Sequence, residues 1–183
     1  MTLGTALALA GAALAIIIAA CGSTVGVVRI SKAANALLAK DTKHFSKLLI
    51  LMLLPSSQTI YALVVAFMML VSLNVLGGQT YAISTNSGLA LLFLCLPVAI
   101  IGGISAAMQG GVGVTSVSLY SKHNKMLGSS ILIISLSEVF ALFGFLISML
   151  GLLFWDFSAY ATNSEAAQTA ACIFQSMTAA VPC

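Results

Sequence analysis

Four long apolar segments determine what this chain can fold into. They cover residues 3–28, 48–76, 87–119 and 127–155, and each exceeds the ~20 residues that an α-helix needs to cross a bilayer. The segments are continuous and do not alternate with a period of two, which argues against a transmembrane β-barrel. Only 6% of the residues are charged and 61% are hydrophobic, whereas soluble domains are about one quarter charged. We therefore expect an all-α integral membrane protein with four transmembrane helices.

The positions of the basic residues predict the topology. All seven lie in two clusters, between the first and second segments and between the third and fourth: Arg29, Lys32, Lys40, Lys43, Lys47, Lys122 and Lys125. Because Lys and Arg are enriched in cytoplasmic loops, we expect both basic loops in the cytoplasm and both termini outside. The charges are placed to bind anionic lipid headgroups, and the net charge of +3 gives no indication of a nucleic-acid partner.

The chain contains an internal repeat with a period of about eighty residues. A helix, a basic loop and a second helix occur twice, and YALVVAF from Tyr61 aligns with FGFLISM from Phe143. This pattern predicts two tandem helical hairpins in parallel orientation, at residues 1–76 and 88–155. An external loop at 77–87 joins them, and an external tail at 156–183 follows. The tail contains Cys172 and Cys183, which can pair if the compartment is oxidising.

Small residues recur at intervals of four in the first and third segments. They are Gly22 and Gly26 in the first, and Gly102, Gly103, Ala106, Ala107, Gly110 and Gly111 in the third. Such rows let helix backbones approach closely in lipid, so we expect these residues to be packing positions. The second and fourth segments are bulky. A circular array with small-residue helices inside and bulky helices outside fits this alternation, and a compact four-helix monomer is the alternative.

Glu138 is an ionisable residue within the fourth apolar segment. It lies thirteen positions after Lys125, which at a rise of about 1.5 Å per residue places it ~20 Å into a hydrocarbon core about 30 Å thick. A charged group at that depth costs several kcal/mol and by default marks a functional site. The alternative interpretation is a protonated Glu that donates a hydrogen bond between helices.

Two amide side chains lie at about the same predicted depth. Gln109 is thirteen positions before Lys122, and Gln58 is eleven positions after Lys47. Because the third and fourth segments form an antiparallel hairpin, Gln109 and Glu138 reach one level in the membrane, and Gln58 lies close to it. We expect these three polar groups from three helices to meet.

The second segment carries further oxygen atoms beside Gln58. Pro55 cannot donate to the carbonyl four residues earlier and its ring disturbs that turn, so backbone oxygen is freed where lipid cannot satisfy it. Leu54, Gln58 and Tyr61 have the spacing i, i+4, i+7 and share one helix face, with Ser57 at its edge. A simple kink explains the proline taken alone. The polar residues on one face favour a site.

The chemistry of these groups predicts a monovalent cation as the ligand. The carboxylate, amide, hydroxyl and carbonyl oxygens suit hard cations, whereas softer metals require His or Cys. One negative charge is neutralised by one Na⁺. A site for a proton alone needs little beyond the carboxyl group, so the amides favour Na⁺, with H⁺ as the alternative. Tyr61 is placed to hydrogen-bond the carboxylate of Glu138, and plain core packing is its alternative role.

The sequence LPSSQTIYALVVAF from Leu54, together with Gln109 and SEVFALFGFLIS from Ser137, resembles the duplicated-hairpin proteolipid, subunit K, of bacterial V-type (V/A-type) rotary ATPases. The resemblance covers the chain from Gly4 to Trp155 and implies a membrane-rotor ring of identical copies. It also implies that sodium is held by the Leu54 carbonyl, Ser57, Gln58, Gln109 and Glu138, with Tyr61 bonded to the Glu. The chain departs from the family pattern in having Ser57 for Thr, Ser56 for Gly, and the tail at 156–183.

The resemblance implies a function that the chain does not perform alone. It is no enzyme by itself, but the ion-carrying component of a machine that couples ATP hydrolysis to Na⁺ transport, most simply in a bacterial cell membrane. Implied partners are a stator membrane protein with an Arg that competes for Glu138, and a central-stalk protein that contacts the cytoplasmic loops. The alternatives are a proton-carrying ring of the same machine, and a free-standing four-helix channel or carrier.

Overall fold

A computed structural model describes residues 2–78, 80–123 and 125–155. The C-terminal segment 156–183, with Cys172 and Cys183, lies outside the described residues, so the prediction that these cysteines can pair concerns a part of the chain that the structure does not describe. Four helical segments in the described part are long and apolar enough to cross a membrane. The prediction of an all-α membrane protein with four transmembrane helices is therefore confirmed.

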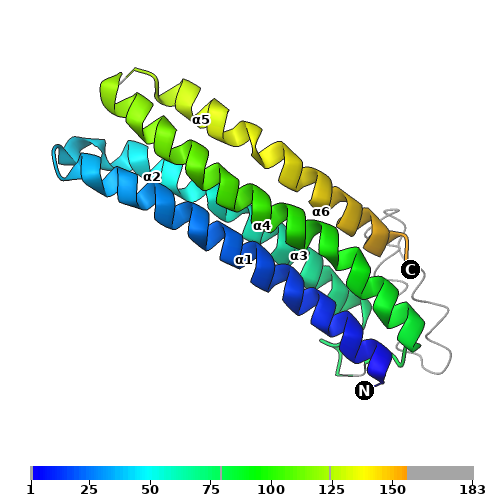
Figure 1. Cartoon of the computed structure of the whole chain (residues 1–183). Coiled ribbons are helices and arrows are strands. Elements are labelled where there is room, and N and C mark those ends of the chain that lie inside the picture. Colours follow the sequence, from blue (N-terminus) through cyan, green and yellow to red (C-terminus); the bar gives the residue numbers. More distant parts are fainter. Residues whose placement is uncertain (1, 79, 124, 156–183) are drawn as a thin grey trace, which may run out of the picture.

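The four spans contain six α-helices, because the second and fourth spans are interrupted (Figure 1). The first span is α1, Leu3–Leu38, and the third is α4, Thr85–Lys122. The second span comprises the 3₁₀ turn Thr42–His44, α2 at Phe45–Leu53, the 3₁₀ turn Leu54–Ser56 and α3 at Ser57–Ser72. The fourth comprises α5 at Leu127–Leu136 and α6 at Glu138–Leu153.

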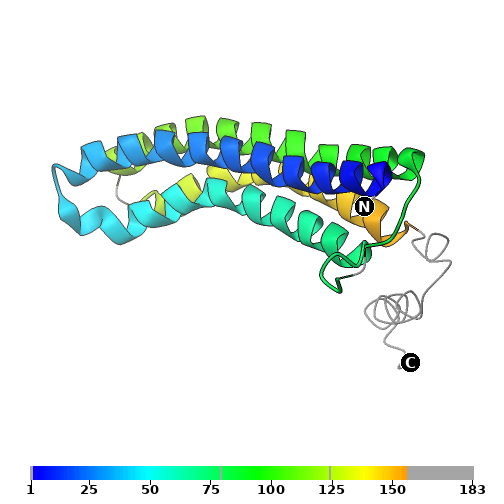
Figure 2. The same ribbon diagram turned by 90° about the horizontal axis from the view of Figure 1, so that it is seen from below.

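The spans form two hairpins that run in the same direction. The α1–α2 and α4–α5 turns lie at one end of the bundle, and the N-terminus, the α3–α4 loop and the end of α6 lie at the other (Figure 1). Helices α1 and α4 form one layer, and α2–α3 and α5–α6 form the second (Figure 2). Equivalent residues cap both long helices: the side chains of Thr2 and Ser84 accept hydrogen bonds from the backbone N–H groups of Thr5 and Ser87.

Glycine residues allow α1 and α4 to pack backbone to backbone. Gly22 lies against the backbone of Gly103, and Gly26 lies against Ala106 and Gly110. A Cβ atom at Gly103 would lie 2.8 Å from the carbonyl oxygen of Ile18, closer than Cβ atoms come to other atoms in proteins. The α1–α4 contact therefore depends on the absence of side chains on both helices, as small residues at such spacing indicate in membrane proteins.

One of the two predicted rows of small residues on α4 does not stay in contact with α1. Gly102 is buried, as are Gly103 and Ala106, but Ala107 is only half-buried and a Cβ at Gly111 would meet no atom within 4 Å. Four residues turn an α-helix by about 40° more than a full circle, so the row that begins at Gly103 turns away from α1. Gly111 therefore contacts no other helix within a single chain, and its role as a packing position stays a prediction.

Helix α1 extends ten residues beyond its predicted end. Arg29 and Lys32, which we expected in a loop, lie on this helix. The segment 29–38 contains Ala and Leu but no Gly or Pro, so nothing in it stops a helix that has already begun. The guanidinium Nη1 of Arg29 donates to the carbonyl oxygen of Ala107 at 3.2 Å, which adds a polar contact between the two long helices.

Candidate ion-binding site

The second span is interrupted at the level of its polar residues. Pro55 has no N–H group, and the chain forms the 3₁₀ turn Leu54–Ser56 there before α3 begins at Ser57. The carbonyl oxygen of Leu54 accepts the backbone N–H of Ser57 and also its hydroxyl, at 3.0 Å. The predicted disturbance at Pro55 is thus present, and the Leu54 carbonyl at this turn bonds to a side-chain hydroxyl as well as to the backbone.

The fourth span is interrupted one residue before Glu138, although no proline is nearby. The carbonyl oxygen of Ile134 accepts the backbone N–H of Ser137 at 3.2 Å and the Nε2 of Gln109 at 3.2 Å. The carbonyl oxygen of Ser137 accepts the hydroxyl of Ser105 at 2.7 Å. Two side chains of α4 therefore donate to backbone carbonyls at the break.

Gln58 and Gln109 form a direct amide pair between the two hairpins. The Nε2 of Gln58 donates to the Oε1 of Gln109 at 2.7 Å, and both side chains have no exposed surface. The hydroxyl of Ser57 also lies 3.3 Å from the Oε1 of Gln58, so its one hydrogen can point either to Leu54 or to Gln58. Because an amide oxygen has two lone pairs, both amide oxygens keep a free direction in which to bind a cation.

Glu138 is the first residue of α6 and is half-buried. Its Oε1 accepts the hydroxyl of Tyr61 at 2.6 Å, and the Tyr61 ring packs against Phe145 with 5.4 Å between ring centroids. Among the described residues, the one ion pair is that of His44 with Asp41. Within this part of the chain, no cation neutralises the carboxylate.

The structure brings the predicted residues together in two hydrogen-bonded groups. Leu54, Ser57, Gln58 and Gln109 form the first group, and Tyr61 with Glu138 forms the second. Ile134 links them, because its carbonyl accepts Gln109 and it lies one helical turn before Glu138 on the fourth span.

The sequence did not predict the parts played by Ser105, Ser137 and the Ile134 carbonyl. Ser105 lies four residues before Gln109, which places the two on one face of α4 and was the available signal. Residues 134–138 contain neither Gly nor Pro, so the sequence carries no strong helix-breaking residue there.

The assembled groups offer oxygen and no nitrogen or sulfur ligand. In the described ranges 2–78, 80–123 and 125–155, no three His, Cys, Asp or Glu side chains cluster in a way that could hold a metal ion. A single carboxylate with neutral amide, hydroxyl and carbonyl oxygens cannot neutralise a divalent cation. It suits a hard ion of charge +1.

Comparison with known proteins agrees with this description. The family model for the C subunit of ATP synthase matches the chain twice, at residues 10–69 and 92–151, which coincide with the two hairpins. The chain is 32% identical over 147 residues to the V-type sodium ATPase subunit K of Enterococcus hirae, covering 80% of this chain and 90% of that protein.

A second relative is the A-type ATP synthase subunit K of Methanocaldococcus jannaschii. It is 28% identical over 130 residues, covering 70% of this chain and 55% of that protein, so the chain spans about half the length of this relative. The double match of the family model covers both hairpins and therefore most of the described residues. The chain belongs to the family of the C subunit of ATP synthase.

Proposed function

We propose that this protein is the ion-carrying component of the rotor ring of a V-type ATPase and that the ion is Na⁺. The buried Gln58–Gln109 pair, which Ser57 connects to the Leu54 carbonyl, supports the choice of ion. A proton carrier has no use for two amide groups that are fully removed from solvent. The resemblance to a relative named a sodium ATPase subunit supports it independently.

The proposed ligands are the carboxylate of Glu138, the amide oxygens of Gln58 and Gln109, the Ser57 hydroxyl and the Leu54 carbonyl. Tyr61 does not bind the ion but holds the carboxylate by its 2.6 Å hydrogen bond. Each proposed amide oxygen accepts at most one hydrogen bond and keeps its second lone pair for Na⁺. The Leu54 carbonyl accepts both the backbone N–H and the hydroxyl of Ser57, so this hydroxyl turns away from the carbonyl when the ion binds.

The ion makes rotation through lipid possible. A bare carboxylate at this depth is expensive, whereas a carboxylate with bound Na⁺ is neutral overall. Each copy in the ring can therefore leave the stator only when its site is loaded, and this requirement couples rotation to transport. We propose that an Arg of the stator membrane protein competes for Glu138 and releases the ion, and that a central-stalk protein transmits the rotation driven by ATP hydrolysis.

The proposed orientation follows from the basic residues. The α1–α2 and α4–α5 turns lie at the same end of the bundle (Figure 1). Lys40, Lys43, Lys122 and Lys125 lie in or next to these turns, and Arg29, Lys32 and Lys47 lie on the helices that lead into them. By the positive-inside rule this end faces the cytoplasm and the termini lie outside. We propose the bacterial cell membrane as the location, with anionic lipid at the basic end.

The decisive experiment is the labelling of Glu138 by a hydrophobic carbodiimide, which modifies protonated carboxyl groups in membranes. With the pH held constant, added Na⁺ should protect Glu138 from labelling, and choline at the same ionic strength should not. The Glu138→Gln variant should remain unlabelled and identifies the modified residue. Labelling that depends on pH but not on Na⁺ would contradict the sodium proposal and support a proton-carrying ring.

A further inference from the structure

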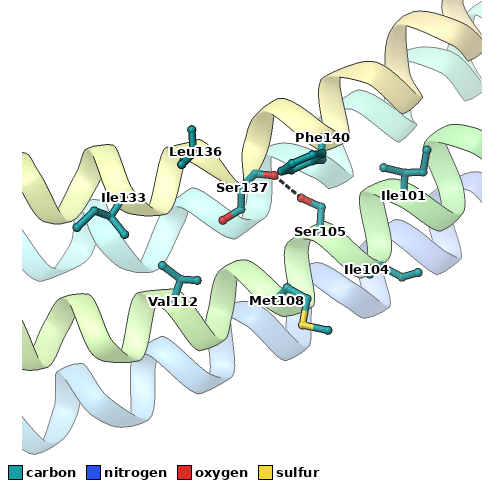
Figure 3. Close-up of a pocket in the computed structure, with 9 residues that line it drawn as sticks. All are labelled: Ile101, Ile104, Ser105, Met108, Val112, Ile133, Leu136, Ser137 and Phe140. Carbon is teal, nitrogen blue, oxygen red and sulfur yellow. Dashed lines mark hydrogen bonds between the residues drawn. The ribbon is translucent and has the colours of Figure 1, made fainter.

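Ser105 of α4 and Ser137 of the fourth span meet in an apolar groove between these two elements (Figure 3). The hydroxyl of Ser105 donates to the carbonyl oxygen of Ser137 at 2.7 Å, and only 8% of the surface of Ser105 is exposed. An unpaired hydroxyl is costly in apolar surroundings, so we expect this bond to be formed permanently. The other residues that line the groove are all apolar: Ile101, Ile104, Met108, Val112, Ile133, Leu136 and Phe140.

The bond reaches the peptide group immediately before Glu138. Helix α5 ends at Leu136, Ser137 follows it, and α6 begins at Glu138. The carbonyl of Ser137 and the N–H and Cα of Glu138 belong to one planar peptide unit. A donor that fixes the direction of this carbonyl therefore also fixes the direction in which Glu138 leaves the backbone. Ser105 can thus orient Glu138 through a single rigid unit.

The backbone at Ser137 has 3₁₀ rather than α geometry. Its φ and ψ are −69° and −21°, and its N–H bonds to the carbonyl of Ile134, three residues earlier, at 3.2 Å. Such values are typical of a 3₁₀-helix. A 3₁₀ turn rotates each residue by about 120° around the axis, whereas an α-helix rotates it by about 100°. Glu138 therefore points in a different direction from the one that a regular helix would give it.

The local sequence does not explain this geometry, but α4 does. Residues 134–138 contain neither Gly nor Pro, and a side chain that inserts into a helical hydrogen-bond ladder is a known cause of helix breaks. Ser105 and Gln109 lie one turn apart on the same face of α4. They donate to the carbonyls of Ser137 and Ile134, at 2.7 and 3.2 Å, so both ends of the distorted turn are bonded to α4.

The first hairpin shows that this contact is specific to the hairpin that carries the acid. When Tyr61 is aligned with Phe143, Ser23 corresponds to Ser105 and Thr59 to Ala141. The hydroxyl of Ser23 accepts that of Thr59 at 2.8 Å. Because Ala141 has no hydroxyl, Ser105 meets no such partner and donates to the backbone instead.

We propose that Ser105 is a positioning residue that gives the site its preference for Na⁺ over H⁺. It is not a ligand of the ion. By holding the peptide group before Glu138, it keeps the carboxylate directed toward the hydroxyl of Tyr61 and the amides of Gln58 and Gln109. This role rests on the proposed function, since it presupposes that Na⁺ binds at Glu138.

The two ions place different demands on the position of the carboxylate. Sodium must contact oxygen atoms from three spans at once, and a binding site of this kind has to be held within about 0.5 Å of the productive geometry. A proton needs only the carboxyl group, and the bond from Tyr61 to Glu138 can follow a small movement of this flexible side chain. Loss of the Ser105 hydroxyl should therefore weaken the binding of Na⁺ and leave the binding of H⁺ unchanged.

The test is carbodiimide labelling of Glu138 in the full-length protein in its membrane. Ser105→Ala should raise the Na⁺ concentration that half-protects Glu138 by about three- to tenfold, as expected for the loss of one neutral hydrogen bond. Without Na⁺, the pH dependence of labelling should equal that of the wild type. This second measurement also establishes that the variant is folded and that Glu138 remains accessible to the reagent.

Two further variants separate the hydroxyl from the size of the side chain. Thr and Val have nearly the same shape, but only Thr has a hydroxyl. Ser105→Thr should keep the Na⁺ concentration for half-protection close to that of the wild type. Ser105→Val should raise it at least as far as Ser105→Ala does. Equal effects of Thr and Val would overturn the assignment to the hydroxyl.

The matched control is Ser148→Ala, which removes a different serine contact between α4 and α6. The hydroxyl oxygen of Ser148 accepts the backbone N–H of Val98 at 3.2 Å, and Ser148 is fully buried. It lies ten residues beyond Glu138, which is ~15 Å at the helical rise. The control should lower the melting temperature in detergent without changing Na⁺ protection.

The outcomes distinguish this role from the proposed function. If Na⁺ protects the wild type and Ser105→Ala at the same concentration, Ser105 does not position the carboxylate. An equal loss of protection in Ser148→Ala, or a parallel change in the pH dependence of Ser105→Ala, would reduce Ser105 to a general packing contact. Absence of Na⁺ protection in the wild type would instead overturn the proposed function, and the selectivity role with it.

Discussion

Tyr61 of the first hairpin donates its phenolic hydrogen to the Glu138 carboxylate of the second, with 2.6 Å between the two oxygen atoms. Gln58, one helical turn before Tyr61, likewise reaches Gln109 across the same boundary. In both pairs a side chain of the first hairpin donates a hydrogen bond to a side chain of the second. The candidate site is therefore shared by the two hairpins.

Replacing Tyr61 with Phe should lower the affinity for Na⁺ by about ten- to a hundredfold. The change removes a hydrogen bond to a charged acceptor, worth about 1.5–3 kcal/mol, but leaves the ring and its contact with Phe145. The measurement is the Na⁺ concentration that half-protects Glu138 from carbodiimide. Tyr81→Phe, the same change in the α3–α4 loop, should leave that concentration unchanged, and an unaltered value in Tyr61→Phe would contradict the positioning role.

Glu138→Gln should abolish Na⁺ transport while the ring still assembles. The neutral amide resembles the loaded site, so the variant has no charge to desolvate and none to exchange at the stator. Transport is measured as ATP-driven ²²Na⁺ uptake into vesicles, and assembly by native gel. The matched control, Glu165→Gln, changes the only other glutamate of the chain and should transport normally. Residual uptake by Glu138→Gln would show that this carboxylate does not carry the ion.

Gln109→Ala and Gln58→Ala should each weaken Na⁺ protection by about ten- to a hundredfold, because each removes one ligand and leaves a buried partner unsatisfied. Gln109→Ala should also destabilise the protein, since its Nε2 satisfies the carbonyl of Ile134. Carbodiimide labelling in the absence of Na⁺ should persist in both. Gln168→Ala in the C-terminal segment is the control, and Na⁺ protection equal to that of the control would remove either glutamine from the site.

Pro55→Ala should raise thermal stability and lower Na⁺ affinity. Alanine restores a backbone N–H and is about 3 kcal/mol more favourable than proline inside a helix, so the 3₁₀ turn at Leu54–Ser56 should become regular α-helix. The Leu54 carbonyl would then bond along the helix and turn from the site. Pro97→Ala in α4 is the matched control, and should raise the melting temperature without changing Na⁺ protection. Unchanged affinity in Pro55→Ala would exclude the Leu54 carbonyl as a ligand.

Gly110→Ala and Gly111→Ala form a pair of adjacent substitutions with opposite expectations. A Cβ at Gly110 meets the backbone of Gly26, whereas one at Gly111 meets nothing within 4 Å. Overpacking costs about 1–3 kcal/mol, so Gly110→Ala should lower the melting temperature in detergent and Gly111→Ala should not. Equal losses would indicate that Gly111 packs against a neighbouring copy.

The fold could be predicted because the membrane limits the choices. Lipid allows only helices and closed barrels, and four apolar runs with two basic clusters leave little besides two tandem hairpins. Helix ends were less predictable. The apolar run ends near Val28, but α1 continues to Leu38, because a helix can extend beyond the hydrocarbon when its residues favour helix formation.

The candidate site could be predicted as far as it depends on depth and helix face. Counting from the basic clusters brought Gln109 and Glu138 to one level, and the structure joins them through the Ile134 carbonyl. Counting could not reveal the break at Ser137. Local helix propensity does not indicate this break. Side chains of α4 donate to the carbonyls of Ile134 and Ser137, so only the tertiary structure shows it.

Ser56 at the break in the second span is the residue that aligns with Glu138 at the break in the fourth span. In the proposed rotor every second hairpin thus passes the stator without an exchangeable charge. For a ring of given circumference this halves the sodium moved per revolution, so the energy of each ATP is divided among fewer ions. The free energy of ATP hydrolysis can therefore move each Na⁺ against an electrochemical potential difference twice as large.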